Sequence, residues 1–409
     1  MGSSPISHDE AGEALQGNRV VAGEVAHIRP WGHEDRVDTH LGGQASHSGE
    51  SGIHLLCRHV THESSLGRAP QARLCQTSSV PSPSVAGPLL ALDTASLYYR
   101  SYFALPSSMT APDGRPHQAI RGFLSTVARL VGTYRPAALV AAWDTDWRPA
   151  WRVELVPSYK AHRVADVTDE AQGAERAEGA EGAPADLDEQ AEAIGHLLDA
   201  LGLPRWGMRD HEADDVLGSL TAQPALWPTG VQQCIVVSGD RDLVQLIDSG
   251  TRLLLTVNGG MDTWPLLDTE MATTRFGVAP DCYVDMATLR GDASDGLPGV
   301  PGIGPKTAVT LVNAFGSVES ALRAAENAGT PPMTPRIAER LREHSVAVLR
   351  AKRVSTAVRD LGLPSVPLMP RQPADPDELE RLAALWGVQR QVREVQVALG
   401  QDDAGSEGS

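Results

Sequence analysis

Three apolar segments that each end in an aspartate constrain the fold of this chain more than any other feature. They span residues 88–93, 138–144 and 234–240 and read PLLALD, ALVAAWD and CIVVSGD. A fourth apolar run, RLLLTV, covers residues 252–257. Continuous apolar runs of this length are typical of strands that are buried on both faces of a sheet, which is the usual environment of parallel strands.

Helical patterns separate these strand segments. They span residues 118–134, 188–201 and 212–220. Strands that alternate with helices predict an α/β fold with a mostly parallel sheet covered by helices on both faces. In such sheets the functional crevice lies at the carboxyl ends of the strands, so the aspartates that end the segments are expected to meet there.

Residues 1–86 have the composition of a disordered extension. No Phe or Tyr precedes Tyr98, and eight of the 13 His residues lie in this stretch, which is rich in Gly, Ser and charge. Such a segment has too few large apolar side chains to offset the entropy that is lost on ordering. The spacing of its histidines with Cys57 and Cys75 fits no compact zinc site, so a solvated tail is the better interpretation.

Cysteine usage and hydropathy indicate the compartment. The other two cysteines, Cys234 and Cys282, lie in apolar contexts, and the four Cys of the chain match no disulfide framework. We find no signal-peptide pattern and no apolar run that approaches the roughly 18 residues of a membrane span. We therefore expect a cytoplasmic protein with no membrane-inserted segment.

The net charge of −17 is unevenly distributed along the chain. Residues 165–192 contain ten acids and one arginine, whereas residues 296–353 contain eight basic residues and four acids. A strongly acidic protein is a poor general binder of nucleic acid, but a local basic module can still neutralise phosphates. The Ala/Glu/Gly-rich stretch from about 165 to 185 predicts a flexible acidic insertion.

Seven acids are expected to gather at the carboxyl ends of the strands. They follow strands or begin the third helical pattern: Asp93, Asp144, Glu212, Asp214, Asp215, Asp240 and Asp242. Carboxylates in one crevice repel each other unless cations share the site, and oxygen ligands suit two Mg²⁺ or Mn²⁺ ions acting on a phosphodiester. Taken singly, each acid is better explained as a helix cap or turn residue. The acids alone leave phosphatases and ribonucleases open.

A glycine-rich turn between helical patterns predicts a DNA contact. Residues 291–308 read GDASDGLPGVPGIGPKTA. Glycines let the backbone approach a phosphate, the start of the next helix offers free N–H groups, and a lysine adds a charge. Contacts of this kind position a duplex without reading its bases. The residues expected to bind DNA are Gly299, Gly302, Ile303, Gly304, Lys306 and Thr307.

Together, six segments resemble the 5′-nuclease domain of bacterial DNA polymerase I and the wider flap endonuclease family. In order along the chain they are LLALDTASLYYRSYFAL, AAWDTD, PSYKAHR, HEADDVLGSL, VVSGDRDLVQL and GDASDGLPGVPGIGPKTA. The resemblance covers about residues 89–353. It implies a PIN-like catalytic domain over residues 87–280 and a helix-hairpin-helix type (helix-3-turn-helix) DNA-binding module over residues 281–365. Residues 366–400 are expected to form C-terminal helices, and residues 401–409 a disordered tail.

The resemblance also implies an activity and its site. It implies a 5′-3′ exonuclease or 5′-flap endonuclease with a two-metal mechanism, working in primer removal or repair as a monomer. The substrate would be flapped, nicked or 5′-ended duplex DNA, or an RNA–DNA hybrid. The implied metal ligands are the seven acids with Asp292 and Asp295, and Arg100, Lys160 and Arg163 are placed near the scissile phosphate. In this family the hairpin motif commonly holds a K⁺ ion.

Some features depart from the family pattern or leave alternatives open. No segment resembles a polymerase domain, and the acidic insertion lies where the family builds its helical arch. Aromatic and basic residues just before it could stack bases and steer a single strand, or the tryptophans could pack at the base of the arch: Trp147, Arg148, Trp151, Arg152, Tyr159, Lys160 and Arg163. A PIN-type ribonuclease and a non-catalytic DNA-structure-binding protein are the alternative functions. The hairpin module argues against the first and the intact set of acids against the second.

Overall fold

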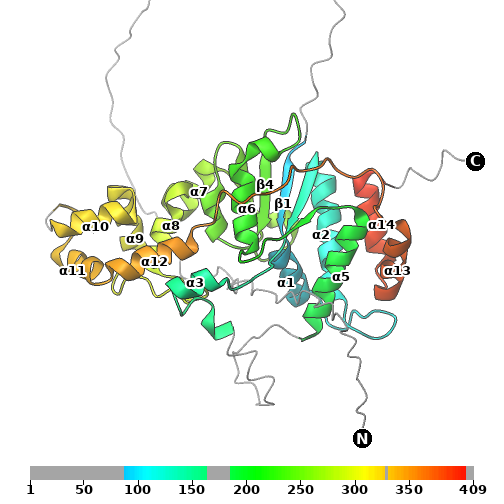
Figure 1. The fold of residues 1–409 in the computed structure, drawn as a ribbon, viewed down its shortest axis with the longest axis horizontal. Coiled ribbons are helices and arrows are strands. Elements are labelled where there is room, and N and C mark those ends of the chain that lie inside the picture. Colours follow the sequence, from blue (N-terminus) through cyan, green and yellow to red (C-terminus); the bar gives the residue numbers. More distant parts are fainter. Residues whose placement is uncertain (1–86, 164–184, 328–329, 402–409) are drawn as a thin grey trace, which may run out of the picture. The chain divides into compact units, whose positions relative to one another are not determined.

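The computed structural model describes residues 87–163, 185–327 and 330–401, which are drawn in colour in Figure 1. The predictions for the extension before residue 87, for almost all of the acidic insertion and for the end of the chain after residue 401 lie outside the described residues.

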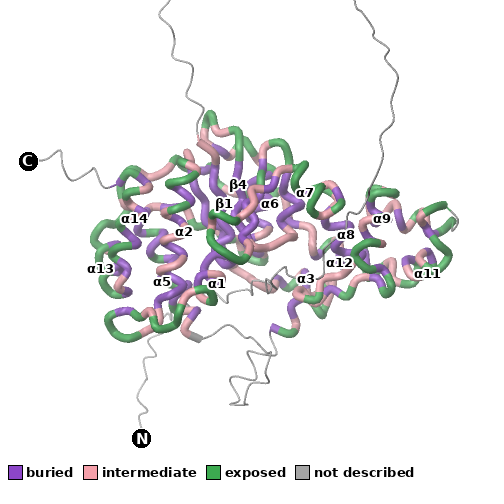
Figure 2. The backbone as a smooth tube through the Cα atoms, turned by 180° about the vertical axis from the view of Figure 1, so that it is seen from behind, coloured by how far each residue is buried: buried purple, intermediate pink, exposed green. Residues whose placement is uncertain are grey.

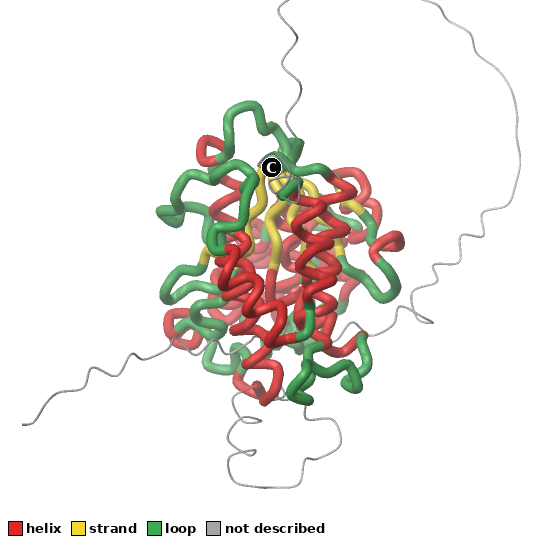
Figure 3. The backbone as a smooth tube through the Cα atoms, turned by 90° about the vertical axis from the view of Figure 1, so that its right-hand side faces the viewer, coloured by secondary structure: helices red, strands yellow, loops and turns green. Residues whose placement is uncertain are grey.

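A six-stranded sheet forms the centre of the described fold. Its order is β3-β2-β1-β4-β5-β6; neighbouring strands are parallel except that β6 is antiparallel to β5. The prediction of a mostly parallel sheet is confirmed, and Figure 3 shows the strands between helical layers. The strands are β1 (Leu89–Asp93), β2 (Ala138–Ala142), β3 (Arg205–Trp206), β4 (Cys234–Ser238), β5 (Thr251–Leu255) and β6 (Leu266–Leu267).

Alternate residues of each central strand supply two hydrophobic cores, one on each face of the sheet. In β1, Leu90 and Leu92 point into one core and Leu89 and Ala91 into the other. Period-two alternation of side chains explains this division, and burial on both faces explains why the segments are continuously apolar. Figure 2 shows the strands as buried along their length.

One face of the sheet carries four long helices and the helix that follows β1. Its core joins side chains from the strands with those of α1 (Thr94–Ala104), α2 (Gln118–Tyr134), α5 (Ala185–Leu201), α13 (Pro376–Trp386) and α14 (Gln389–Leu399). α14 packs along α2, and α13 packs along α5, as Figure 1 shows. The described C-terminal part of the chain thus ends in two helices that complete the core on this face of the sheet.

The other face is covered by helices that continue into the helical module. α6 (Ala213–Ala222), η2 (Asp242–Leu246) and α7 (Thr269–Phe276) contribute to its core. The same core includes residues of the module, whose helices are α8 (Tyr283–Arg290), α9 (Pro305–Phe315), α10 (Val318–Glu326), α11 (Pro335–Glu343) and α12 (Ser345–Ser355). The predicted helical module is thus present, and it shares its core with one face of the sheet.

After α12 the chain returns across the sheet domain without forming a helix or strand until α13. The backbone N–H groups of Val358, Val366, Met369 and Asp375 donate to groups of the sheet domain along the way. No described helix is long and apolar enough to cross a membrane.

Candidate functional site

Three of the predicted acids lie at neighbouring strand ends. Asp93 is the last residue of β1, and Asp144 and Asp240 each follow the end of β2 or β4 by two residues. Because β2, β1 and β4 are adjacent and parallel, these carboxyl groups lie at one edge of the sheet. Asp93 also caps α1, since its Oδ1 accepts from the N–H of Ser96 at 3.0 Å. The cap and the site are therefore two roles of one side chain.

The start of α6 brings three further acids to this edge. Glu212 is the N-cap residue, and the N–H of Ala213 donates to Oδ1 of Asp144 at 2.8 Å, which joins α6 to the end of β2. Asp214 follows with a partly exposed side chain, and its pKa lies well above 3.8 because burial and repulsion from Asp240 and Asp93 disfavour its charged form.

Raised pKa values show that the acids act on one another as a cluster. Burial, with repulsion from Asp144, raises the pKa of Asp93 from 3.8 to about 7. Burial, with repulsion from Asp295 and Asp292, raises the pKa of Asp240 to about 6. The same two causes, burial first and then repulsion from Asp240, raise the pKa of Asp242. Carboxyl groups this close cannot all be charged unless a cation offsets the repulsion.

Asp292 and Asp295 belong to the loop between α8 and α9, and their charges reach the cluster from the helical module. The Oδ1 atom of Asp292 accepts from the N–H of Ser294 at 2.9 Å. Asp295 accepts at Oδ1 from Arg163 Nη2 at 3.1 Å. Residues from the sheet domain and the module therefore meet electrostatically, as the sequence predicted.

The acids have the type of ligand atom that a hard divalent cation prefers, although their side chains also form hydrogen bonds within the protein. All the donors are carboxylate oxygens, which suit Mg²⁺ or Mn²⁺. In the described ranges, no group of three or more Asp, Glu, His or Cys side chains is arranged to hold a metal ion. Polar neighbours contact several of the acids: Ser238 Oγ donates to Asp93 Oδ2 at 2.5 Å, for example. The mutual repulsion that raises the pKa values is what a bound cation would relieve.

Asp215, which the sequence predicts as a metal ligand, is held by three donors of the protein. Its side chain is fully buried, and Oδ1 accepts from Arg152 Nη2 at 2.7 Å and from the N–H of Val358 at 2.9 Å. Its Oδ2 accepts from the N–H of Glu212 in the capping box of α6. These contacts connect α3, the start of α6 and the chain after α12.

Lys160 lies beside Glu212 on the segment that follows α3 (Ala150–Leu155). Its Nζ is 2.9 Å from Glu212 Oε2, and although burial disfavours the ammonium, the attraction of Glu212 holds the pKa of Lys160 well above 10.5. The backbone of Lys160 has φ +48°, a left-handed conformation that is uncommon for residues with a side chain. Its N–H donates to the carbonyl of Asp295 at 3.0 Å. The lysine is thus held between the two groups of acids.

The other two predicted phosphate contacts are held by different partners. Arg163 is buried and binds Asp295 and the carbonyl of Ser294. Arg100 donates to the carbonyls of Val257 and Gly259, and its guanidinium lies 5.2 Å from the ring centroid of Trp264. The structure brings Lys160 and Arg163 to the acids, whereas Arg100 contacts the loop after β5.

Arg152 is a site residue whose role the sequence did not reveal. The sequence left open whether its side chain contacts a single strand; in the structure that side chain is 3% exposed and forms ion pairs with Glu212 and Asp215, each at 2.7 Å. These pairs hold the guanidinium against the start of α6, so the structure gives Arg152 a role in the fold of the site. Trp151 is partly exposed, and its ring lies against Arg152 and Arg353. A basic residue in a short helix carries no sequence signal of burial.

The glycines of the hairpin loop before α9 differ in how closely other backbone atoms approach them. A Cβ on Gly299 (φ +64°) would lie 2.5 Å from the nitrogen of Gly291, so this glycine allows two backbone segments to approach each other. Gly302 (φ +84°) and Gly304 are exposed and have open space beside them. The side chain of Ile303 is 4% exposed and packs in the core, so only the backbone of this residue is placed to contact DNA as predicted.

The start of α9 presents the features of a phosphate contact. Gly304 caps the helix without a side-chain hydrogen bond, and Pro305 occupies the first turn. Lys306 is exposed and Thr307 partly exposed at the same end. Free N–H groups at a helix start attract an anion, and a lysine there adds a full charge.

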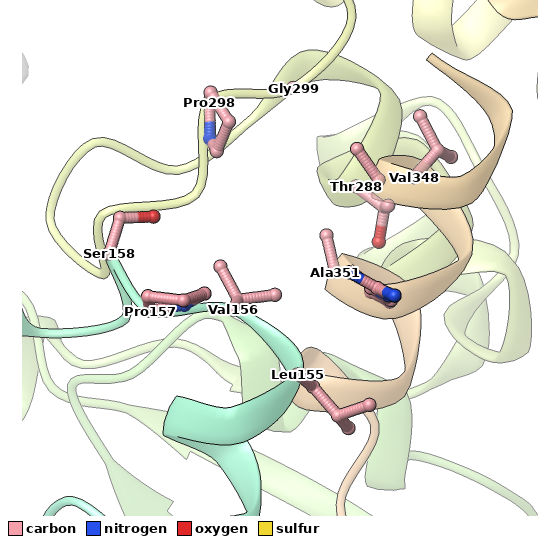
Figure 4. A pocket seen from close by; sticks show the side chains of 11 residues that line it. Leu155, Val156, Pro157, Ser158, Thr288, Pro298, Gly299, Val348 and Ala351 are labelled. Atoms are coloured by element: carbon pink, nitrogen blue, oxygen red, sulfur yellow. The ribbon is translucent and has the colours of Figure 1, made fainter.

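An apolar cavity of about 200 Å³ lies between α3, α12 and the hairpin loop. Leu155, Val156, Pro298 and Val348 are among its lining residues, as Figure 4 shows. None of the acids of the cluster lines it. The cavity is therefore separate from the charged site.

Comparison with known proteins identifies relatives of both parts of the chain. Residues 88–277 match the model of the 5′-3′ exonuclease N-terminal resolvase-like domain, and residues 278–377 match the 5′-3′ exonuclease C-terminal SAM fold. A 5′-3′ exonuclease of Streptomyces coelicolor is 45% identical over 73% of this chain and 95% of its own length. A 5′-3′ exonuclease of Mycobacterium tuberculosis is 40% identical over 76% of this chain and 98% of its own length.

More distant similarity extends to polymerases and to a solved structure. DNA polymerase I of Mycobacterium tuberculosis is 31% identical over 75% of this chain, which corresponds to 31% of the polymerase. A crystal structure of the T5 D15 protein with metal ions has a TM-score of 0.50 and 18% identity, covering 76% of this chain and 99% of that protein. This structural likeness supports the fold described above.

Proposed function

Because the chain belongs to the 5′-3′ exonuclease family, we propose that it hydrolyses phosphodiester bonds of DNA at 5′ ends and 5′ flaps with the help of divalent cations. The observation that carries this proposal is the cluster of acids at the ends of β1, β2 and β4, whose pKa values are raised by burial and by one another. Membership of the family indicates the class of reaction, and the cluster of acids is the proposed site of that reaction.

The cations would be held by the acids whose oxygens face the edge of the sheet. We assign this role to Asp93, Asp144, Asp214, Asp240 and Asp242, with Glu212, Asp292 and Asp295 beside them. When bound, Mg²⁺ or Mn²⁺ would lower the pKa of an attacking water and stabilise the leaving oxygen. Two ions are expected, each of them Mg²⁺ or Mn²⁺.

Lys160 and Arg163 would act on the phosphate. Both side chains are buried, and both pair with acids at the edge of the cluster, Glu212 and Asp295. A cation that takes Glu212 as a ligand would weaken the hold of that acid on Lys160. The ammonium would then be available to stabilise charge that develops on the phosphate oxygens.

The start of α9 would bind the duplex part of the substrate. Gly302, Gly304 and Lys306 are exposed there, and the first turn of α9 has no side-chain cap. The contact would be to backbone phosphate, and a K⁺ ion in the loop would strengthen it. We propose a monomer that acts in primer removal or repair, with RNA–DNA hybrids as a second substrate.

A cleavage assay on a 5′-labelled flap duplex tests the proposal. We expect cleavage with Mg²⁺ or Mn²⁺ and none in excess chelator, and a variant Asp240→Asn should be inactive under both conditions. A blunt duplex, a nicked duplex and a single strand in parallel separate exonuclease from flap cleavage. Full activity of the parent protein in chelator, or equal cleavage by Asp240→Asn, would refute the assignment.

A further inference from the structure

Asp215 joins three parts of the molecule that come from distant stretches of the chain. Its Oδ1 receives Arg152 Nη2 from α3 at 2.7 Å and the N–H of Val358, after α12, at 2.9 Å. Its Oδ2 receives the N–H of Glu212 at the start of α6. A fully buried carboxylate with this many donors is satisfied by the protein itself.

The first of the three parts carries Lys160. Arg152 spans Glu212 and Asp215 with its two terminal nitrogens, each 2.7 Å from a carboxylate oxygen. Residues 156–159 lead from α3 to Lys160, and the hydroxyl of Tyr159 donates to both oxygens of Glu212 at 3.0 Å. Arg152 and Tyr159 therefore tie α3 and the segment that leads to Lys160 to the start of α6.

The second part is the strap, which we define as residues 355–361 and which begins at the last residue of α12. Gln245 of η2 holds it from one side: Oε1 accepts from the N–H of Ala357 at 3.0 Å, and Nε2 donates to the carbonyl of Ser355 at 3.0 Å. Nε2 of Gln245 also donates to the carbonyl of Asp242 at 2.8 Å. The strap is thus tied to an element that carries one of the acids.

The third part is α6, on which the strap lies in close contact. Ser219 Oγ donates to the carbonyl of Val358 at 3.0 Å and accepts from the N–H of Leu361 at 3.1 Å. A Cβ on Gly218 would lie 2.6 Å from the same Val358 carbonyl. No side chain fits between α6 and the strap at this point, so the contact fixes their spacing.

We propose that Asp215 is a positioning residue, which sets the Lys160 segment and the DNA-binding module relative to the metal-binding acids, and that it does not bind metal itself. This inference rests on the proposed function of the site. It also assigns different roles to two adjacent acids: Asp214 belongs to the cluster of acids, whereas the carboxylate of Asp215 is bound by other groups of the protein. Loss of the contacts of Asp215 would let Lys160 and the bound duplex move relative to the reacting phosphate.

Melting temperatures with and without metal distinguish a positioning residue from a ligand. We expect Asp215→Asn to lower the Tm in chelator, because Arg152 loses a buried partner, and to keep the rise in Tm that Mg²⁺ or Mn²⁺ produces. The matched variant Asp214→Asn should show the reverse pattern: an equal or higher Tm in chelator, and a smaller rise with metal. Asp215 is a ligand, and the proposal is overturned, if Asp215→Asn loses the metal response and keeps its Tm in chelator.

Single-turnover cleavage measures the positioning role directly, well below the Tm of each variant. At saturating DNA we expect Asp215→Asn and Arg152→Gln to cleave about tenfold to a hundredfold more slowly, the scale on which small misplacements near the chemistry act, with unchanged Kd for DNA. Arg152→Lys should recover part of the loss, and the double variant should be no slower than the slower single variant. Rates equal to the parent overturn the proposal.

Gly218→Ala keeps the experiment decisive if Asp215→Asn does not fold. Alanine favours a helix more than glycine does, so any loss must come from displacing the strap. We expect a slower single-turnover rate with an unchanged metal response. A parental rate for Gly218→Ala would show that the strap does not position the site. Failure of the parent protein to cleave DNA would instead refute the proposed function, while the Tm comparison in chelator still tests the Arg152–Asp215 joint.

Discussion

The Nζ atom of Lys160 lies 2.9 Å from Oε2 of Glu212, so the lysine closest to the acids is held by one of them. The same residue has φ +48°, and its N–H binds the carbonyl of Asp295. A left-handed conformation at a residue with a side chain costs on the order of 1 kcal/mol and persists only where neighbouring contacts enforce it. Contacts from both parts of the molecule therefore hold the ammonium at the edge of the cluster.

We expect Lys160→Ala to lower turnover far more than affinity for DNA. The buried ammonium would stabilise charge on the phosphate in the transition state, a contribution of roughly 3 kcal/mol for groups of this kind. Single-turnover rates at saturating flap DNA, with Kd measured separately, check this. A variant that cleaves at the parental rate, or one that loses only affinity, would place the role of Lys160 in binding.

Lys306→Ala should have the opposite effect. Its side chain is exposed at the start of α9, so its loss should weaken duplex binding about equally for all sequences and lower the salt dependence of binding by about one phosphate contact. The single-turnover cleavage rate of this variant at saturating DNA should equal that of the parent protein. Arg336→Ala is the control, since it removes an equal exposed charge at the start of α11. A sequence-selective loss would contradict a contact to backbone phosphate.

Asp240→Asn and Asp242→Asn should each lower the cleavage rate by orders of magnitude and leave duplex binding nearly unchanged. Both acids belong to the cluster, whereas duplex binding is assigned to the region around Gly302 and Lys306. Rates and Kd in saturating Mg²⁺ give the comparison. Asp377→Asn, at an exposed acid of α13, is the control and should behave like the parent. Near-parental cleavage by either cluster variant would show that the ligands are misassigned.

The metal-free protein should become less stable as the pH rises from 3.8 towards 7. Burial and repulsion raise the folded-state pKa of Asp93 from 3.8 to about 7 and that of Asp240 to about 6. These carboxyls bind protons more tightly in the folded chain, so stability is present below 3.8 and is lost as they ionise through their folded pKa values. Tm measured in chelator across this range should fall with rising pH, and the fall should be shallower in Asp240→Asn. If the Tm of the parent protein rises with pH over the same range, the raised pKa values assigned to Asp93 and Asp240 are wrong.

The sheet and the acids at its edge were predictable because both depend on local sequence. A strand that is buried on both faces must be apolar throughout, so segments such as 234–240 can be recognised in the sequence. The acid at the end of each segment is then identified with it. The helix at Gln118–Tyr134 was predicted to the residue, because its apolar side chains recur at helical spacing. The helix that ends at Leu201 begins three residues before its predicted start, at Ala185.

The roles of individual polar residues were less predictable because they depend on partners far along the chain. Asp215 looks like its neighbour Asp214 in sequence, and only the approach of Arg152 and Val358 separates their roles. In the same way Gly299 resembles Gly302, but the proximity of Gly291 makes it a close-packing residue. Sequence spacing identifies the types of residue at a site, and tertiary contacts assign each one its role.

The packing of α14 along α2 has a consequence for how the protein is made. Val392, Val395 and Leu399 belong to the same core as Phe123 and Leu124. During synthesis, the α2 surface leaves the ribosome long before the helix that covers it. The helical layer on this face of the sheet is therefore completed by the last helix that the structure describes, and a nascent chain that has not yet released α14 leaves Phe123 and Leu124 without part of their core.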